Sequence, residues 1–460
     1  MLRDRYAVDQ FFISIQALAS EMDPELAQID LLLDDELLFQ MIKRDLAQRY
    51  PRTTETGRPS TPVEVILRML VVKRLYRWSY EQTERHVGDS LVLRRFCRVY
   101  FESVPDDTVL IRWAKRIQPQ TLALLNDHVT ALATQLKLTR GRRLRTDGTV
   151  VESNIHYPTD SSLLHDGVRV LSRVLKRAQK MLGNACTLGK NTFRDRTRSA
   201  KRAAQQIGHQ ARRGRQALKT TYRRLLRIAR ASLHQAQVVR EALIAQADQA
   251  ADALRECIDT FLPRVEQVID QTKRRIVDGE QVPAAEKLVS LFEPHTQIIK
   301  RGKPRHETEF GHKIWLDEVD GGIISGFRIL DGNPADTEQW QPSLDHHVQQ
   351  FARPPDLASA DRGVHSAANE RYAQELGVRR VILPKPGAKS APRRQYELQS
   401  WFRRGRRWHA GIEGRISVVK RKHGLGRCLD RGPDGFGRWV GWGVIAANLA
   451  VLGHAMAAKA

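Results

Sequence analysis

The sequence predicts an α/β protein in which a mixed sheet with helices is interrupted by a long helical insertion and preceded by an all-α N-terminal domain. Three observations predict this class. Residues 61–138 carry helix signals, residues 161–290 are helical and rich in Ala, Gln and Leu, and residues 310–422 alternate between strand and helix patterns. Hydrophobic residues make up 41% of the chain, which excludes a disordered protein. The length of 460 residues indicates roughly two to four domains.

The charge balance indicates a polyanionic partner. Lys and Arg number 76 against 52 Asp and Glu, which gives a formal net charge of +24. Such an excess repels itself unless a polyanion neutralises it. Nucleic acid is therefore the first candidate partner, and an anionic membrane surface is the second.

Three features bear on the compartment. The N-terminal residues carry charges of both signs and show no secretory signal pattern. The apolar stretch Trp439–Ala458 is long enough to span a membrane, but Asn448 and His454 interrupt it, so a buried C-terminal helix is the better interpretation. The four cysteines are isolated and lack metal-ligand spacing, so we expect inert thiols in a reduced cytoplasmic compartment.

The N-terminal part of the chain is expected to be helical. Residues 1–60 form a short helical region, and residues 61–138 form consecutive short helices. Capping boxes are predicted at Thr61–Glu64, with Pro62 at the first helical position, and at Ser79–Gln82. Short helices with tight turns and a basic surface favour a helix-turn-helix-like DNA-binding domain over residues 61–138. A plain helical bundle that supports the next domain is the alternative.

A strand is predicted at Arg142–Asp147, with Asp147 near its end. Residues 161–299 then form a basic helical insertion, which we expect to fold as a long antiparallel helical hairpin. Its segment Arg169–Arg230 contains nineteen Lys and Arg but one acid, Asp195. A solvated helix face is the usual explanation of a charge run, but so large an imbalance favours contact with a phosphate backbone.

Residues 310–422 give the most informative pattern. Lys313–Val319 and Ile323–Leu330 alternate like strands around Gly321-Gly322 and predict a hairpin. The following elements are predicted in order: a helix capped by Asp336 and ending near Phe351, a strand Leu357–Asp361, a helix from His365 to near Leu376, a strand Val378–Leu383, and a helix from near Glu397 to Lys422. Together with the strand of Asp147, this order is the topology of an RNase H-like domain, formed by residues 139–160 and 300–460.

Three acids stand at related places in this order. Asp147 and Asp361 close two strands, and Glu413 lies on the last helix of the domain. Two Mg²⁺ ions about 4 Å apart can cleave a phosphodiester by clamping its attacking and leaving oxygens, and these ions prefer carboxylate ligands. Singly, each acid also fits a turn residue, an ion-pair partner or a helix-surface acid. Together, on so basic a chain, the three predict a metal-dependent catalytic site.

The helix that contains Glu413 carries further candidates. Ile412, Ile416 and Val419 form an apolar stripe, and Glu413 lies on nearly the same face as Lys420. Basic and aromatic residues of this helix are expected to bind DNA: Arg406, Arg407, Trp408, His409, Arg415, Lys420, Arg421 and Lys422. A position in the core is the alternative for the tryptophan.

Four segments carry a family resemblance: Thr146–Glu152 (TDGTVVE), Asn154–Ser162 (NIHYPTDSS), Ala360–Gly363 (ADRG) and Glu413–Lys420 (EGRISVVK). In them the chain resembles DDE transposases of bacterial insertion sequences, including the group named ISNCY, and the resemblance covers most of the chain. In related enzymes the Glu belongs to a signature in which Tyr, Arg and Lys stand at fixed spacings. The spacing to Lys420 fits, whereas His409 stands at the Arg position and Arg406 at the Tyr position.

The resemblance implies a transposase that acts in the bacterial cytoplasm on nucleoid DNA. It would bind terminal inverted repeats and target DNA, and it would catalyse strand cleavage and strand transfer. Asp147, Asp361 and Glu413 would hold two Mg²⁺ ions, for which Mn²⁺ substitutes. A homodimer or a larger assembly would bring two DNA ends together, with no membrane partner.

Two other functions stay open. One is a non-catalytic DNA-binding protein, an inactive or co-opted transposase relative that acts as a regulator. The other is an RNA-directed nuclease of the same fold, which is weaker because no RNA-binding module is visible in the sequence.

Overall fold

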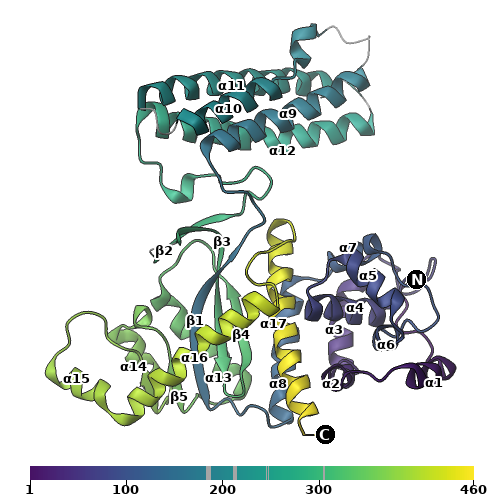
Figure 1. Cartoon of the computed structure of the whole chain (residues 1–460), viewed down its shortest axis with the longest axis vertical. Coiled ribbons are helices and arrows are strands. Elements are labelled where there is room, and N and C mark those ends of the chain that lie inside the picture. Colours follow the sequence, from purple (N-terminus) through teal and green to yellow (C-terminus); the bar gives the residue numbers. More distant parts are fainter. Residues whose placement is uncertain (183–187, 211–214, 245, 247, 304–305, 460) are drawn as a thin grey trace. The chain divides into compact units, whose positions relative to one another are not determined.

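The structure is a computed structural model that describes residues 1–182, 188–210, 215–244, 246, 248–303 and 306–459. The chain divides into two compact units, whose elements are labelled in Figure 1. Unit 1 comprises Met1–Glu152 and His312–Ala460, and unit 2 comprises Ser153–Gly311. Each unit has hydrophobic core residues of its own.

The N-terminal part of unit 1 is all-helical, as predicted. Asp9, Asp23, Asp35 and Asp106 each accept a backbone N–H bond at the start of a helix, which satisfies donors that the helix itself leaves unpaired. The helices are α1 (Gln10–Ala19), α2 (Pro24–Leu32), α3 (Glu36–Ala47), α4 (Val63–Tyr76), α5 (Tyr80–Asp89), α6 (Leu91–Phe96), α7 (Asp107–Ala114) and α8 (Pro119–Gln135).

The two predicted capping boxes have different outcomes. The box at Ser79–Gln82 is confirmed at the start of α5. The prediction for Thr61–Glu64 is wrong, because α4 begins after an N-cap Pro62 that makes no side-chain bond. The carboxylate of Glu64 instead lies 3.3 Å from the guanidinium of Arg68. Arg68 is fully buried, and its carboxylate partners offset the cost of removing its charge from water.

The sheet of unit 1 is mixed. Strand β1 (Arg143–Glu152) lies between β3 (His306–Val319) and β5 (Leu357–Ser359). Strand β5 runs parallel to β1 and to β6 (Arg380–Ile382), whereas β4 (Ile323–Ile329) pairs antiparallel with β3. The resulting order β4-β3-β1-β5-β6 makes a mixed α/β fold with the helices around the sheet (Figure 1).

The predicted hairpin is confirmed by the pairing of β3 with β4. Its turn contains Gly321 and Gly322, which have φ angles of +86° and +76°. These values suit glycine, and a Cβ on Gly321 would lie 2.2 Å from the carbonyl oxygen of Leu138. The turn therefore needs glycine both for its backbone conformation and for its contact with the end of α8.

Strand β1 is longer than predicted. It continues to Glu152, so Asp147 lies in the middle of the strand, and the prediction that Asp147 stands near its end is wrong. Gly148 does not turn the chain. It leaves room for the ring of Trp315, whose atoms would lie 3.1 Å from a Cβ at this position. The buried, β-branched Val150 then continues the strand.

The remaining elements of unit 1 alternate with the strands. The predicted cap of α13 is wrong, because Asp336 begins the short helix η5 and bonds the half-buried Nζ of Lys313 instead. The elements are η5 (Asp336–Gln339), α13 (Trp340–Phe351), η6 (Arg362–Val364), α14 (Ala367–Glu375), α15 (Ala391–Leu398), α16 (Ser400–Lys422) and α17 (Gly432–Ala457).

Helix α17 is the one described helix that is long and apolar enough to cross a membrane. In its most apolar window 67% of the residues are buried inside the protein. Asn448 in this helix is fully buried, accepts the N–H of Ile324 at 2.9 Å and donates to the side chain of Asn126 at 2.9 Å. These bonds satisfy a polar group inside the core, as the predicted buried helix requires.

Unit 2 contains four long helices among its described residues, so the prediction of a single helical hairpin is wrong. Helix α11 packs against α9, α10 and α12, and α9 also packs against α12. Apolar residues of all four helices form one core. Two helices alone could not bury a core of this size. The helical elements are α9 (Asp160–Leu182), η2 (Lys190–Phe193), α10 (Thr197–Gln210), α11 (Arg215–Ile244), α12 (Gln249–Thr272), η3 (Lys273–Asp278) and η4 (Ala284–Glu286).

Strand β2 (Gln297–Lys303) in unit 2 was not predicted. It pairs antiparallel with the first part of β3, where Ile298 is opposite Phe310.

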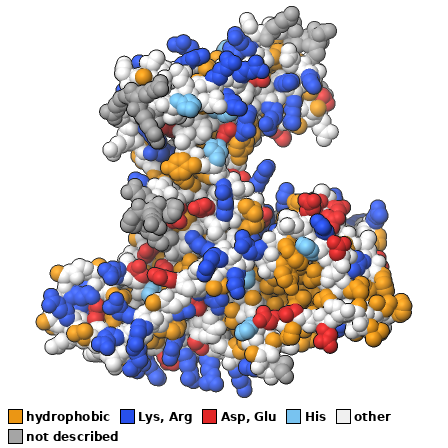
Figure 2. All heavy atoms as spheres, viewed as in Figure 1, with side chains coloured by type: hydrophobic (Ala, Val, Ile, Leu, Met, Phe, Trp, Pro, Cys, Tyr) orange, Lys and Arg blue, Asp and Glu red, His pale blue; other side chains and the backbone are white. Residues whose placement is uncertain are grey.

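On the helices of unit 2, basic side chains are exposed to solvent, and Figure 2 shows Lys and Arg over much of this surface. Of the four cysteines, Cys97, Cys257 and Cys428 take part in no disulfide, and Cys186 lies outside the described residues.

Candidate functional site

The three acids that were predicted to be catalytic line one pocket of unit 1. Asp147 lies in the middle of β1, Asp361 lies just after β5, and Glu413 lies on α16. The pocket has a volume of about 280 Å³, and its other lining residues are Ala360, Arg362, Ile382, Pro384, Arg406, His409, Ala410 and Ile412.

The register of the sheet brings the first two acids to one level. Strands β1 and β5 are parallel neighbours, and Arg145 is paired with Ser359. Asp147 and Asp361 each follow this pair by two residues, and side chains two residues apart point to the same face of extended chain. The two aspartates are therefore neighbours in space although they are far apart in the sequence.

Helix α16 supplies the third acid because it packs on β1, β5 and β6. Two glycines permit this close approach. A Cβ on Gly411 would lie 2.2 Å from Nη1 of Arg145, and a Cβ on Gly405 would lie 2.6 Å from the Cδ1 atom of Ile382. Both positions weaken an isolated helix, but here the missing side chains let the helix carry Glu413 to the sheet.

The carboxylates of the two aspartates are oriented by bonds to their own backbone. Oδ1 of Asp147 accepts the N–H of Gly148 at 2.7 Å, and Oδ1 of Asp361 accepts the N–H of Gly363 as the cap of η6. Asp147 is half-buried, whereas Asp361 and Glu413 are exposed to solvent. The pocket therefore presents carboxylate oxygens to whatever enters from solvent.

A buried ion pair fastens α16 to the sheet. The carboxylate of Glu318, 2% exposed, accepts two bonds from Arg145, at 2.7 and 2.6 Å. Nη1 of Arg145 also donates to the carbonyl oxygen of Trp408 on α16. Arg415 lies on the same carboxylate at 3.7 Å and its side chain is 13% exposed. The side chain of Arg415 thus faces Glu318, so we propose no DNA contact for it.

His409 lies in the pocket as a half-buried, uncharged side chain. Its Nδ1 is 3.3 Å from the hydroxyl of Ser359. Burial lowers the pKa of His409 to about 4, with Asp361 acting in the opposite direction and Arg145 in the same direction as burial. The ring is therefore neutral at pH 7 and adds no positive charge to the pocket.

Two guanidinium groups at the pocket are exposed to solvent, those of Arg362 and Arg406. Arg406 was predicted as a DNA-binding residue. Arg362 was not, although its place directly after Asp361 could have suggested it. Both groups can make bidentate bonds to a phosphate.

Lys420 does not line the pocket of the three acids. It lines a different cavity, because seven residues of helix separate it from Glu413 by about 10 Å along the axis. The predicted apolar stripe is confirmed, with Ile412 and Val419 both buried. Arg407, Arg421 and Lys422 are exposed, whereas the ring of Trp408 lies 4.9 Å from the guanidinium of Arg145.

The pocket fits a hard cation in donor type. Carboxylate oxygens are the ligands that Mg²⁺ prefers, and it completes its shell with water. Within the described residues, no three His, Cys, Asp or Glu side chains are close enough to hold one ion together. Asp147, Asp361 and Glu413 thus share a pocket without forming a closed metal cluster, and their role as ligands stays a prediction.

Two substitutions on α16 should have opposite effects on stability. Gly405→Ala places a methyl group against the fully buried Ile382 and should lower the free energy of unfolding by about 1–3 kcal/mol. Gly414→Ala meets no atom within 4 Å and should raise it by about 0.5–1 kcal/mol through helix propensity. Urea unfolding of both variants checks this, and equal effects would contradict the close packing of α16 on β6.

Comparison with known proteins gives one match. Residues 14–116 match the family model described as a transposase domain (DUF772). This match supports a transposase family and, with it, DNA as the partner. The matched segment runs from within α1 to the residues just after α7 and contains none of the three pocket acids. No curated protein and no solved structure matches the chain.

Proposed function

We propose that the protein is a DDE transposase that binds the terminal inverted repeats of an insertion sequence, cleaves the DNA and transfers its strands. The single observation that carries the proposal is the meeting of Asp147, Asp361 and Glu413 in one pocket from β1, the end of β5 and α16. The strand order β4-β3-β1-β5-β6, with one antiparallel hairpin and parallel later strands, supports an RNase H-like domain around them.

The three carboxylates would hold two Mg²⁺ ions, or Mn²⁺ in their place. When bound, such ions neutralise the charge on the phosphate and activate the attacking oxygen. The chain's own contribution is to position the DNA. Arg362 and Arg406 at the pocket would bind phosphates beside the scissile bond, which holds the strand in line for attack. The neutral His409 leaves the charge of the bound phosphate to those two guanidiniums and the metal.

Binding of duplex DNA is proposed for two further surfaces. In unit 2, exposed Lys and Arg of α9, α10 and α11 would contact the phosphate backbone. In unit 1, the exposed Arg407, Arg421 and Lys422 of α16 would make separate phosphate contacts. A helix-turn-helix role for residues 61–138 belongs to the same proposal. Two DNA ends must be joined, so we propose a homodimer or larger assembly as the active form.

Divalent metal should control the activity. Purified full-length protein is incubated with a labelled duplex that carries the inverted repeats flanking its gene and with a target plasmid. We expect nicked ends and strand-transfer products with Mg²⁺ or Mn²⁺, and none with EDTA, because carboxylates alone cannot stabilise the phosphate charge. Products that persist in EDTA would contradict the metal-dependent mechanism.

A second candidate function is a non-catalytic DNA-binding regulator. The observation in its favour is that the three carboxylates do not form a closed metal cluster among the described residues. The same assay separates the two functions. Tight binding of the inverted repeats without any cleavage in Mg²⁺ or Mn²⁺ would favour the regulator.

A further inference from the structure

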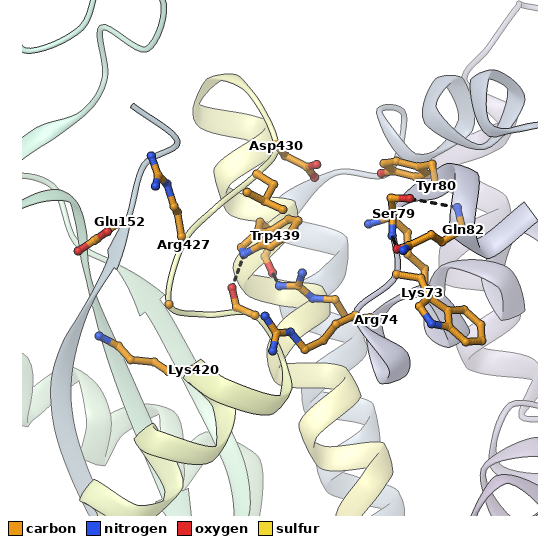
Figure 3. Close-up of a pocket in the computed structure, with 15 residues that line it drawn as sticks. Lys73, Arg74, Ser79, Tyr80, Gln82, Glu152, Lys420, Arg427, Asp430 and Trp439 are labelled. Carbon is orange, nitrogen blue, oxygen red and sulfur yellow. Dashed lines mark hydrogen bonds between the residues drawn. The ribbon is translucent and has the colours of Figure 1, made fainter. Parts of the chain in front are cut away.

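A second pocket of unit 1, with a volume of about 800 Å³, lies between the N-terminal helices and the C-terminal helices. Figure 3 shows Ser79 and Tyr80 on one side of it and Asp430 and Trp439 on the other. Its lining includes more cations than acids. The cations are Lys73, Arg74, Arg77, Lys420 and Arg427, and the acids are Glu152 and Asp430.

Two of these cations, Lys73 and Arg74, are buried in the last turn of α4. Their exposed fractions are 9% and 5%. In the part of the chain that the structure describes, no carboxylate lies within 4.0 Å of either side chain. Asp430 is the acid that acts on both, from beyond ion-pair distance. Two adjacent positive charges are therefore buried at a cavity without a counter-charge in contact.

The protein holds Arg74 in place but leaves one of its hydrogen-bond donors unpaired. Its Nη2 donates to the backbone carbonyl oxygen of Trp439 at 2.6 Å, and its guanidinium lies 3.9 Å from the centre of the Trp439 ring. Its buried Nε has no hydrogen-bond partner. Gly424 and Gly443 make room for the group, since a Cβ at either would lie 3.2 or 3.0 Å from its nitrogens. An unpaired buried donor is costly unless a ligand completes it.

Lys73 contacts rings rather than acids. Its ammonium lies 4.2 Å from the centre of the Tyr80 ring and 5.6 Å from that of Trp439. Burial lowers the pKa of Lys73 to about 8 and that of Arg74 to about 10, because each positive charge loses hydration that no carboxylate in contact replaces. Cations are common in the last turn of a helix because they interact favourably with the helix dipole, but their charged groups normally remain exposed to water. Lys73 and Arg74 are instead buried in the wall of a cavity.

We propose that this pocket binds a phosphate group, with Lys73 and Arg74 as its direct ligands, and that the phosphate belongs to a DNA strand. A phosphate supplies the counter-charge that neither Lys73 nor Arg74 has in contact, and it supplies acceptors for the ammonium of Lys73. Tyr80, which is half-buried at the pocket, adds a ring surface against which the adjoining nucleotide can pack. The assignment to DNA rests on the proposed transposase function, whereas the phosphate chemistry does not.

The test compares Lys73→Met with Lys137→Met. Both remove one positive charge, but Lys137 is exposed and lies outside this pocket. Binding of a duplex inverted-repeat end is measured in EDTA, so that no cleavage occurs. We expect Lys73→Met to bind about tenfold more weakly and with a salt slope smaller by about one, and Lys137→Met to bind nearly like wild type. The melting temperature of Lys73→Met should not fall, because the substitution removes an unpaired buried charge.

A second arm identifies the source of the phosphate. Inorganic phosphate and a deoxynucleoside monophosphate are titrated against wild type and Lys73→Met, with thermal stability as the readout. Weakened DNA binding by Lys73→Met supports the proposal as stated. Loss of phosphate stabilisation with unchanged DNA binding would assign the pocket to a free phosphate compound. If Lys73→Met changes neither DNA binding nor stabilisation by phosphate, the pocket proposal is overturned. If the wild type binds no DNA, the proposed function fails, and the phosphate titration still shows whether the pocket binds phosphate.

Discussion

Asp361→Asn should reduce strand transfer in Mg²⁺ on the order of 10³-fold, a loss of about 4 kcal/mol of transition-state stabilisation. The amide removes the negative charge that the proposed metal site needs and keeps the size of the side chain. Asn is also a good helix cap, so the bond to the N–H of Gly363 at the start of η6 should survive. The measurement is the initial rate of product formation with saturating DNA ends, and binding of those ends should stay near the wild-type level.

Asp356→Asn is the matched control for this variant. Asp356 stands just before β5 as Asp361 stands just after it, and it pairs with Arg353 at 3.0 Å on the surface. Loss of such an exposed pair should change stability by less than about 1 kcal/mol and leave strand transfer unchanged. Strand transfer that survives Asp361→Asn, or that is lost equally in Asp356→Asn, would show that the catalytic assignment of Asp361 is wrong.

Arg68→Met should lower the free energy of unfolding by about 3–5 kcal/mol. The guanidinium of Arg68 is fully buried and lies 2.6 Å from the carboxylates of both Asp30 and Asp34 and 3.3 Å from that of Glu64. Removing it leaves three carboxylates around an apolar side chain. Arg98, at 3.0 Å from Asp30, can offset part of the loss, so the lower half of the range is expected.

Urea unfolding, with the midpoint and slope both fitted, checks this prediction. Arg85→Met is the control, because Arg85 is 80% exposed and its ion pair with Asp89 is long, at 3.9 Å. It should change stability by less than about 0.5 kcal/mol. If the two variants unfold at the same urea concentration, the buried network around Arg68 does not stabilise the N-terminal helices.

Local patterns predicted those features whose partners are close in the sequence. The capping box at Ser79–Gln82 and the hairpin of β3 and β4 both depend on residues a few positions apart. The same patterns failed where a distant group competes. Glu64 was expected to cap its helix but faces Arg68, whose burial also depends on Asp30 and Asp34 from α2 and the residues after it. Local periodicity carries no information about such competition.

The same distinction applies to the candidate sites. The sequence predicted Asp147, Asp361 and Glu413 as site residues because recognisable elements stand around them in a consistent order, and the structure brings the three to one pocket. It misplaced Lys420, which lines the phosphate pocket proposed here instead of the pocket of the three acids. It also gave no sign of Lys73 and Arg74, because the end of α4 resembles the basic last turn of any helix.

By itself, the sequence determined most element types, the basic charge and the choice of the three candidate acids, since these depend on residue identity and short-range periodicity. Only the tertiary structure decided that the acids share a pocket, that Arg145 and Arg415 converge on Glu318, and that Arg74 is buried beneath Trp439. The physical reason is separation along the chain: Arg145 and Glu318 are 173 residues apart, and Arg74 and Trp439 are 365 apart. Contacts over such distances depend on how strands and helices pack, and packing leaves no local pattern in the sequence.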